Sequence, residues 1–232
     1  MDLKEIDQEN QHKIIQNTLR TQISEDEITE IIEGLLMEIE AGSILYSIEE
    51  GNEKIGFIIA TPLSENEDPN NIDYLSIDEI WIKTEYENSK IPNELSVNLK
   101  KLAKKYKTNK IEIIVSQNVV WLGNALLENG YICYEVKLEK LLPKANNLTD
   151  VLELIQESTP ADRIVQVLLE KDDNFQTEFV EEADELIDQI SEGWLPVMVV
   201  VIFEPENQSF MEIIEYSNKM INWDDYSIIY RL

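Results

Sequence analysis

Cysteine and histidine are almost absent from this chain of 232 residues, and their scarcity excludes several kinds of site. Cys133 is the only cysteine, so an internal disulfide or a cysteine-rich zinc module cannot form, and a reducing cytoplasm suits the chain. His12 is the only histidine, so one chain cannot build a histidine-based metal site or a pair of catalytic imidazoles. We therefore expect no metal centre.

Positive charge and long apolar runs are also scarce. The chain has 19 Lys and Arg against 47 Asp and Glu, a formal net charge of −28, which repels a polyanion such as nucleic acid. The longest apolar run, Leu195 to Phe203, is too short to span a bilayer and contains Pro196. The first 20 residues lack the apolar segment of a signal peptide. We expect a cytoplasmic protein that binds neither nucleic acid nor a membrane.

What is present suggests one large or two small packed domains, since 43% of the residues are hydrophobic. A boundary is expected at residues 143–147, which separates a first domain (1–142) from a more acidic C-terminal α+β domain (147–232). Residues 146–232 hold 20 acidic and 4 basic residues. Residues 1–145 therefore hold the other 27 acidic and 15 basic residues. No motif in the second domain carries chemistry, although strand 195–203 could mediate an oligomer.

Apolar periodicity and turn residues predict alternating strands and helices in the first domain. The capping-box spacing of Ser24 and Glu27 opens the second helix. The predicted strands cover residues 2–6, 43–49, 54–61, 74–83, 110–116 and 131–138, with helices from about 7, from 24, over 94–107 and from 118, and loops at 62–71 and 85–93. In the second domain we predict helices near 148–157, 160–171, 175–191 and 208–220, and strands at 195–203 and 226–231.

Several segments in this order match one known family. The segment Ile80-Trp81-Ile82-Lys83-Thr84-Glu85-Tyr86 is followed by a turn, a helix, the strand 111–115, Ser116-Gln117-Asn118, and a helix that ends in Gly130-Tyr131. The opening Leu3-Lys4-Glu5-Ile6-Asp7 resembles the family's first strand. Together they resemble the GCN5-related N-acetyltransferase (GNAT) superfamily over about 60% of the chain. This resemblance implies an α/β (α+β) fold with a mixed central sheet flanked by helices, and acetyl-CoA or coenzyme A as cofactor.

The segment that corresponds to the family's phosphate loop is degenerate. The family uses Arg/Gln-x-x-Gly-x-Gly/Ala so that backbone amides at a helix start can approach the pyrophosphate. Here it reads Glu87-Asn88-Ser89-Lys90-Ile91-Pro92, with an anion first, no glycine and one missing amide donor. The tyrosine that often serves as general acid would be Ala125, or Leu126 after a one-residue insertion, and neither can donate a proton.

The resemblance still implies candidate site residues. Asp78 and Glu79 lie where the family often places a catalytic base, and strand alternation predicts that they point to opposite faces. Backbone amides near Ile82 would hold the thioester carbonyl, and Tyr131 or Tyr134 could supply a phenol. The remaining cofactor contacts would be Lys90, Asn93 and Asn118, although Asn118 also suits a helix N-cap.

Seven lysines between residues 90 and 110 have three possible roles. They can form a solvated helix face, bind the coenzyme's phosphates, or dock on an acidic surface such as residues 170–192.

Two functions remain open. The first is an acyl-CoA-dependent N-acetyltransferase of low or atypical activity, which acts on an unknown small-molecule or peptide amine. The second is a non-catalytic module that has lost coenzyme A binding and acts through a protein partner or a homo-oligomer.

Overall fold

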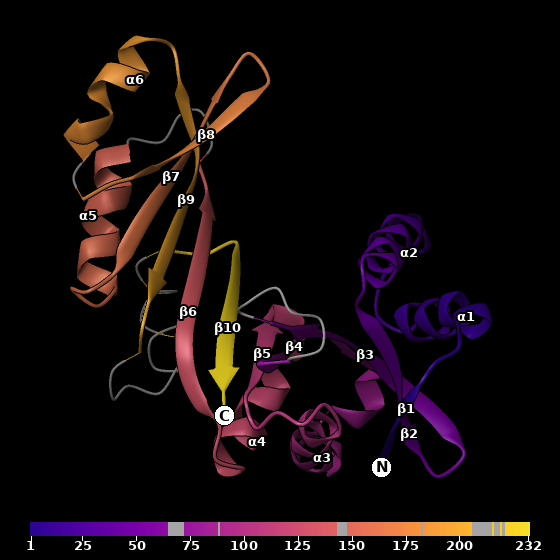
Figure 1. Ribbon diagram of the computed structural model, residues 1–232. Coiled ribbons are helices and arrows are strands. Elements are labelled where there is room, and N and C mark those ends of the chain that lie inside the picture. Colours follow the sequence, from indigo (N-terminus) through magenta and orange to yellow (C-terminus); the bar gives the residue numbers. More distant parts are fainter. Residues whose placement is uncertain are drawn as a thin grey trace. The chain divides into compact units, whose positions relative to one another are not determined.

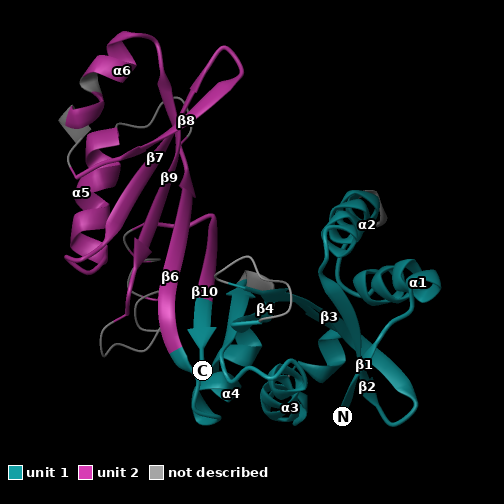
Figure 2. Ribbon diagram, viewed as in Figure 1, with its two compact units in different colours: residues 1–132, 229–232 teal, residues 133–228 magenta. Residues whose placement is uncertain are grey.

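The computed structural model describes residues 1–64, 72–87, 89–142, 148–181, 183–205 and 221–232, together with Glu215 and Lys219. The chain forms two compact units (Figure 2): unit 1 contains residues 1–132 and 229–232, and unit 2 contains residues 133–228. The expected boundary at 143–147, part of the predicted loop 62–71 and most of the predicted helix 208–220 lie outside the described residues. The two units divide between Ile132 and Cys133, at the beginning of a strand that pairs within unit 2 over residues 136–141.

Unit 1 is a mixed sheet with helices on both faces (Figure 1). Strands β1 to β4 are antiparallel neighbours in chain order, and β4 pairs with β5 in parallel. The last residues of β10 complete the sheet beside β5, where the Leu232 amide donates to the Ile111 carbonyl. In chain order the elements are β1 (Asp2–Glu5), α1 (Gln8–Leu19), α2 (Glu25–Glu40), β2 (Ile44–Glu50), β3 (Glu53–Leu63), β4 (Tyr74–Ile82), the 3-10 helix η1 (Thr84–Tyr86), α3 (Ile91–Lys105), β5 (Ile111–Ser116), the 3-10 helix η2 (Gln117–Leu122), α4 (Gly123–Glu128) and β10 (Asp225–Arg231).

Local sequence explains several of these boundaries. The predicted capping box is present at the start of α2, where the Glu27 carboxylate accepts from the Ser24 amide at 3.4 Å. Gly42 follows α2 with φ +122°, a conformation that side chains other than glycine rarely adopt. Helix α3 starts at Ile91, three residues before the predicted start, because Pro92 is well suited to the first helical turn.

Helices α1 and α2 cover one face of the unit 1 sheet, and α3 and α4 lie on the other (Figure 1). The first face forms a core in which Leu45, Phe57 and Ile59 of the sheet are fully buried. Trp81 packs against the edge of this core, with its ring centroid 6.5 Å from that of Phe57. The mixed α+β sheet architecture expected from the sequence is confirmed.

Unit 2 contains a second antiparallel arrangement. Its strand order is β10-β6-β9-β7-β8, where β10 takes part through residues 225–228. Because β9 pairs with both β6 and β7, the predicted strand 195–203 exists but has no free edge for an oligomer. The other elements are β6 (Ile132–Leu141), α5 (Leu148–Ser158), β7 (Ile164–Lys171), β8 (Asn174–Phe179), the 3-10 helix η3 (Ala183–Leu186), α6 (Ile187–Ser191) and β9 (Leu195–Phe203).

Two predicted helices of this unit are wrong. Residues 164–171 form strand β7, and the predicted helix 175–191 is strand β8 followed by the short η3 and α6. Asp172 and Asp173 both adopt positive φ and join β7 to β8 as a two-residue turn. The spacing of four between Phe175 and Phe179 places both on one face of a helix, but equally on one face of a strand. In the described part of the chain, no helix is both long and apolar enough to cross a membrane.

Candidate active site

A β-bulge in β4 brings the two candidate catalytic carboxylates to one face of the unit 1 sheet. Glu79 pairs with Ile59 and Ile77 pairs with Ala60, so Asp78 is the extra residue between them. A bulge shifts the alternation of side chains by one position. Asp78 accordingly contacts Thr61. Thr61 lies on the same face of the sheet as Ile59, and Ile59 pairs with Glu79, so both carboxylates lie on this face. The prediction that Asp78 and Glu79 point to opposite faces is wrong.

Hydroxyl groups on neighbouring strands hold the Asp78 carboxylate. Thr61 Oγ1 donates to Asp78 Oδ2 at 2.5 Å, and Ser76 Oγ donates to Asp78 Oδ1 at 2.5 Å. Ser43 Oγ lies 2.9 Å from Thr61 Oγ1 and can donate to it, since the Thr61 hydrogen is directed at Asp78. Both Asp78 oxygens are thus fixed in place, which suits this residue to positioning rather than to proton transfer.

Glu79 has the electrostatic properties of a general base. Burial raises the pKa of its carboxyl group to about 7, the charges of Glu38 and Asp78 add to this increase, and a hydrogen bond from Trp81 opposes it. That bond runs from Trp81 Nε1 to Glu79 Oε2 at 2.8 Å. Burial, and then the Asp78 charge, also raise the pKa of Glu38 on α2. A carboxyl group with a pKa near 7 can accept a proton at neutral pH and release it again.

The backbone at Ile82 lies beyond the parallel ladder between β4 and β5. That ladder joins only Leu75–Ile77 to Ile111–Ile113. The Lys83 amide donates to the Ile55 carbonyl on β3, so strand alternation directs the amide of Ile82 away from β3. The Ile82 carbonyl on the same side accepts a hydrogen bond from Gln22 Nε2. The Ile82 amide therefore points away from β3, and its role as the carbonyl anchor stays a prediction.

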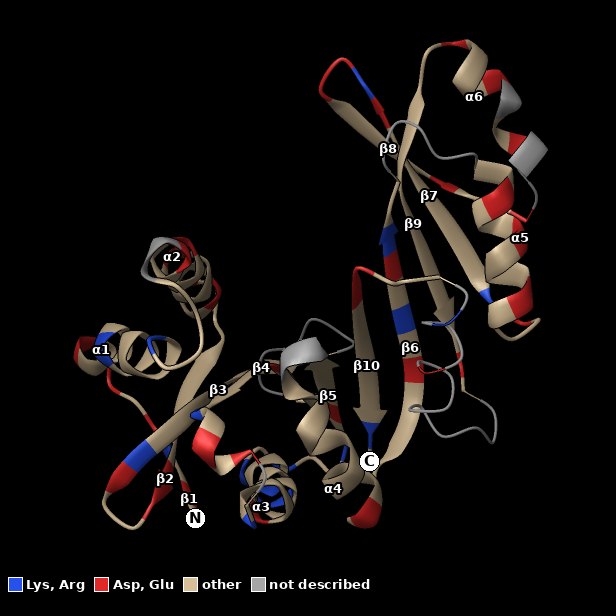
Figure 3. Cartoon of the chain, turned by 180° about the vertical axis from the view of Figure 1, so that it is seen from behind, with Lys and Arg blue, Asp and Glu red and all other residues tan. Residues whose placement is uncertain are grey.

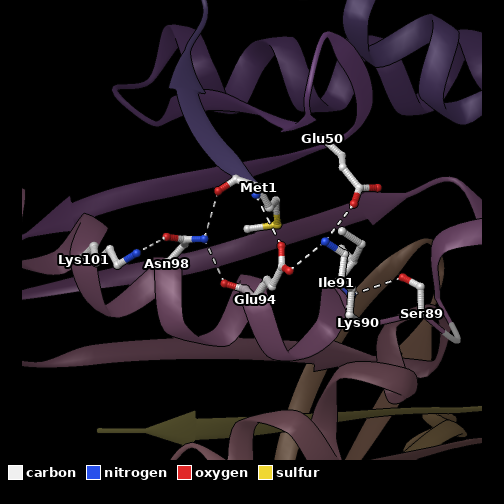
Figure 4. A network of polar contacts seen from close by, with 8 residues as sticks. All are labelled: Met1, Glu50, Ser89, Lys90, Ile91, Glu94, Asn98 and Lys101. Atoms are coloured by element: carbon white, nitrogen blue, oxygen red, sulfur yellow. Dashed lines mark hydrogen bonds and ion pairs between the residues drawn. The ribbon is translucent and has the colours of Figure 1, made fainter.

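The start of α3, where the predicted phosphate loop would end, carries a network of polar contacts (Figure 4). The Lys90 ammonium group lies 3.2 Å from Glu50 Oε1 and 3.0 Å from Glu94 Oε1. Hydrogen bonds to Glu94, then to Glu50, raise the pKa of Lys90. The Ile91 amide donates to Ser89 Oγ at 3.1 Å.

This helix start does not fit a pyrophosphate in the way that the family's loop does. Ser89 already accepts from the amide of the first helical residue, and Pro92, the second, has no amide hydrogen. The two carboxylates that pair with Lys90 would also repel a phosphate group. Glu87, close by in the sequence, adds a third carboxyl group. Burial raises the pKa of this group. The degenerate loop is therefore also unsuited in three dimensions.

The other predicted cofactor contacts have partners of their own. Asn93 lies in the first turn of α3, and its Oδ1 accepts from Asn129 Nδ2 at 3.1 Å. Asn118 lies in η2, whose N-cap is Ser116, and its side chain lies outside the described part of the structure. Of the candidate phenols, Tyr131 is buried and donates to the Ser96 carbonyl at 3.0 Å, whereas Tyr134 lies on β6 in unit 2.

Helix α3 carries several lysines, coloured blue in Figure 3, and two of them make contacts within unit 1. Lys100 donates to the Asn129 carbonyl and lies 4.9 Å from the centre of the Tyr131 ring. Lys105 donates to Glu5 Oε2 at 3.0 Å. These contacts occupy two of the seven lysines, and the choice between a solvated helix face and coenzyme binding stays a prediction. Docking on residues 170–192, which belong to unit 2, stays a prediction.

The element order of unit 1 matches the order that the sequence resemblance predicts, from the first strand to the helix that ends in Gly130-Tyr131. The parallel pairing of β4 with β5 inside an otherwise antiparallel row completes the match. The fold of unit 1 resembles that of the GNAT superfamily. Neither a family model nor a curated protein matches the chain in sequence.

The solved structures that are similar to this chain include three acetyltransferases. The aminoglycoside 6′-acetyltransferase type Ii is 18% identical, with 63% of this chain and 90% of that chain covered and a TM-score of 0.46. The PaiA N-acetyltransferase from Thermoplasma acidophilum, in complex with coenzyme A, is 19% identical (57% and 89% covered, TM-score 0.40). A GNAT acetyltransferase from Elizabethkingia anophelis with acetyl-CoA bound is 11% identical (88% and 97% covered, TM-score 0.41).

On this GNAT fold, sequence reasoning missed several residues of the site. Glu38, Ser43, Thr61 and Ser76 surround the two carboxylates, yet none stands in a motif. The unshifted register of the predicted hairpin places Ser43 opposite Ala60, and a register shift between Ile48 and Glu49 brings Ser43 beside Thr61. The bulge had no signal in the sequence. Among the described residues, no group of three or more His, Cys, Asp or Glu side chains could hold a metal ion.

Proposed function

We propose that the protein transfers an acetyl group to an amine, with Glu79 as the base that accepts a proton from the amine. The observation that carries this proposal is the bulge in β4, which places Glu79 and Asp78 on one face beside Glu38. Negative charge at this position attracts an ammonium group, and Glu79 can accept its proton near neutral pH. Asp78 acts as a positioning residue that keeps the bulge in place through Thr61 and Ser76.

Acetyl-CoA would supply the acetyl group in this reaction. In this proposal the Ile82 amide donates to the thioester carbonyl of acetyl-CoA. This role depends on the direction of the backbone and on no side chain. Lys90, Asn93 and Asn118 remain proposed contacts for the coenzyme, although the pyrophosphate does not fit at the start of α3. We therefore propose an activity that is low or atypical for this fold, and we assign no phosphate contact.

The start of α3 favours a second candidate function. Ser89, Pro92 and the paired carboxylates lie at the start of α3, where the predicted phosphate loop would end. A GNAT-derived module that binds an amine or a protein partner without catalysis would tolerate this change. The two candidates differ in one measurable property, the affinity for coenzyme A.

The deciding experiment is a calorimetric titration of the full chain with acetyl-CoA, at low and at high salt. Micromolar binding that weakens with salt would support the enzyme, and turnover would then be sought with a panel of amines. In that case Glu79→Gln should lower turnover by about 100-fold or more without loss of acetyl-CoA binding. Absence of binding at millimolar acetyl-CoA would instead support the non-catalytic module.

A second experiment tests the placement of the phosphate loop. Replacement of Glu87 by Arg, Ser89 by Gly and Pro92 by Gly restores a cation, a free helix amide and a backbone donor. If the loop is placed correctly, this variant should bind acetyl-CoA at least tenfold more tightly than the native chain. The matched control is Lys101→Gly, since Lys101 lies on the same helix and its ammonium group donates to Asn98 Oδ1 at 2.9 Å. An unchanged affinity of the triple variant would show that the loop lies elsewhere.

A further inference from the structure

Strand β8 forms an exposed edge of the unit 2 sheet. It is the last strand in the order β6-β9-β7-β8, and its ladder partner in the described structure is β7. Phe175 and Phe179 on this strand are 61% and 69% exposed. An edge strand with exposed aromatic side chains is unusual, because proteins generally protect such edges against pairing with another chain. The edge is therefore a candidate interaction surface.

Three alternate residues of β8 direct their backbone hydrogen-bonding groups away from β7. The Val180 amide donates to the Val165 carbonyl at 2.9 Å, so Val180 directs its backbone groups toward β7. In an antiparallel ladder this direction alternates along the strand. Phe175, Thr177 and Phe179 therefore direct their amides and carbonyls outward, away from β7. An added strand could bond to all three residues.

The side chains of the same three residues share one face of the sheet. They pair with Glu170, Leu168 and Gln166 of β7, respectively. The opposite face carries the buried residues Val165, Val167 and Leu169 and lies on the side of α5 and α6 (Figure 1). The open face thus places two aromatic rings directly beside the unpaired edge, where apolar side chains of an added strand could pack on them.

Charge around this edge selects the kind of partner. Residues 170–181 contain five carboxylates, which lie near the end of β7, at the tip of the hairpin, on β8 and just after β8. They belong to Glu170, Asp172, Asp173, Glu178 and Glu181. The hairpin tip is red in Figure 3. Lys171 is the one basic residue in this range, and its ammonium group donates to the Glu192 carbonyl at 2.6 Å. The edge is therefore apolar with an acidic rim.

We propose that the β8 edge binds an extended, basic segment of a partner polypeptide, which adds to the unit 2 sheet as a further strand. Main-chain hydrogen bonds would supply affinity, and alternating apolar and basic side chains would contact the Phe175/Phe179 face and the carboxylates. A second copy of this chain fits less well, since each copy has a net charge of −28.

The probes for this proposal are two fluorescent peptides, one that alternates lysine with valine and one that alternates arginine with phenylalanine. Binding to the full chain is followed by fluorescence anisotropy at low and at high salt. We expect at least one peptide to bind, with an affinity that falls as salt rises. Methylation of every second backbone nitrogen in that peptide, which removes donors to the edge, should weaken binding about tenfold or more. A glutamate–valine peptide should not bind.

The matched protein variants are Thr177→Pro and Thr177→Val. Proline removes the outward amide hydrogen of Thr177 and leaves the bonds to β7, whereas valine keeps that hydrogen. We expect Thr177→Pro to weaken peptide binding about tenfold or more and Thr177→Val to change it less than about threefold. Thermal unfolding checks that both variants are folded. Phe179→Ser, at an exposed position that leaves the backbone unchanged, provides a second test and should also weaken binding.

Three outcomes would overturn the proposal. The first is that neither basic peptide binds. The second is that the bound peptide tolerates backbone methylation, or that both Thr177→Pro and Phe179→Ser bind it as the native chain does. The third is that sedimentation shows a dimer of the native chain that Thr177→Pro abolishes, which would assign the edge to a second copy.

Discussion

At the scale of single residues, the ionisation of Glu79 links the candidate site to folding stability. Its carboxyl pKa is about 7 in the folded chain, against 4.5 for an unperturbed glutamate. Because the folded-state pKa is raised, this group contributes stability that is fully present below pH 4.5 and is lost as pH rises through 7. A neutral residue at position 79 should avoid this loss.

Glu79→Gln should therefore be more stable than the native chain at pH 8, by at most about 3 kcal/mol, because one pKa unit corresponds to about 1.4 kcal/mol. At pH 4 the two proteins should have nearly equal free energies of unfolding. Urea titrations at a series of pH values measure this difference. A difference that does not change between pH 4 and pH 8 would contradict the raised pKa.

Trp81→Phe should move the pKa of Glu79 further upward. The indole hydrogen bond to Glu79 favours the carboxylate, so its removal leaves burial and the charges of Glu38 and Asp78 without this opposition. Phenylalanine can keep the contact with Phe57. NMR titration of the Glu79 carboxyl carbon reports the shift directly, and a lower pKa in the variant would show that the hydrogen bond does not form.

At the scale of elements, the close approach of β3 and β4 holds the strand that carries the site. A Cβ atom added to Gly56 would lie 2.2 Å from the Trp81 carbonyl oxygen and 2.9 Å from Ile82 Cα, both backbone atoms that cannot move independently of β4. Gly56→Ala should therefore lower the free energy of unfolding by about 3 kcal/mol or more. It should also disturb the hydrogen bond between Trp81 and Glu79.

Gly34→Ala is the matched control for this prediction. Gly34 lies within α2, and an added Cβ atom would have no neighbour within 4 Å. Alanine should stabilise the helix by about 0.5–1 kcal/mol. Chemical denaturation of both variants measures the contrast. Equal effects of the two substitutions would mean that β3 and β4 do not approach as closely as the structure shows.

At the scale of the whole molecule, unit 1 includes residues from both ends of the chain. Tyr230 on β10 is fully buried, and a Cβ atom added to Gly123 would lie 2.7 Å from its hydroxyl oxygen. Arg231 Nε donates to Glu112 Oε2 at 2.7 Å on the neighbouring strand β5. The N-terminal part is thus completed by residues that follow unit 2 in sequence.

Tyr230→Ala should cost about 3–5 kcal/mol, as expected for removal of a buried aromatic side chain, and Tyr230→Phe should cost much less. A fragment of residues 1–142, the first domain predicted from the sequence, lacks Tyr230 and should unfold at a lower temperature than the full chain. Circular dichroism melts of the two variants, the fragment and the full chain test this. A fragment as stable as the full chain would show that unit 1 does not need β10.

The sequence by itself determined the mixed α+β class, the order of elements in unit 1 and the position of Asp78 and Glu79 on its central strand. Local signals were sufficient there, because caps, turns and apolar spacing depend on neighbours in sequence. The second unit was less predictable. A spacing of four residues suits a helix and a strand equally, so β8 was predicted as a helix.

Only the tertiary structure decided what the candidate residues contact. The bulge in β4 depends on the register with β3, and that register turns Asp78 and Glu79 to one face. The raised pKa of Glu79 comes from burial and from Glu38, which lies 41 positions earlier in the sequence. Likewise, the position of β8 as the last of the described strands in the unit 2 sheet follows from the order in which distant strands pair. Burial, register and edges are relations between distant segments, and no local pattern in a single sequence contains them.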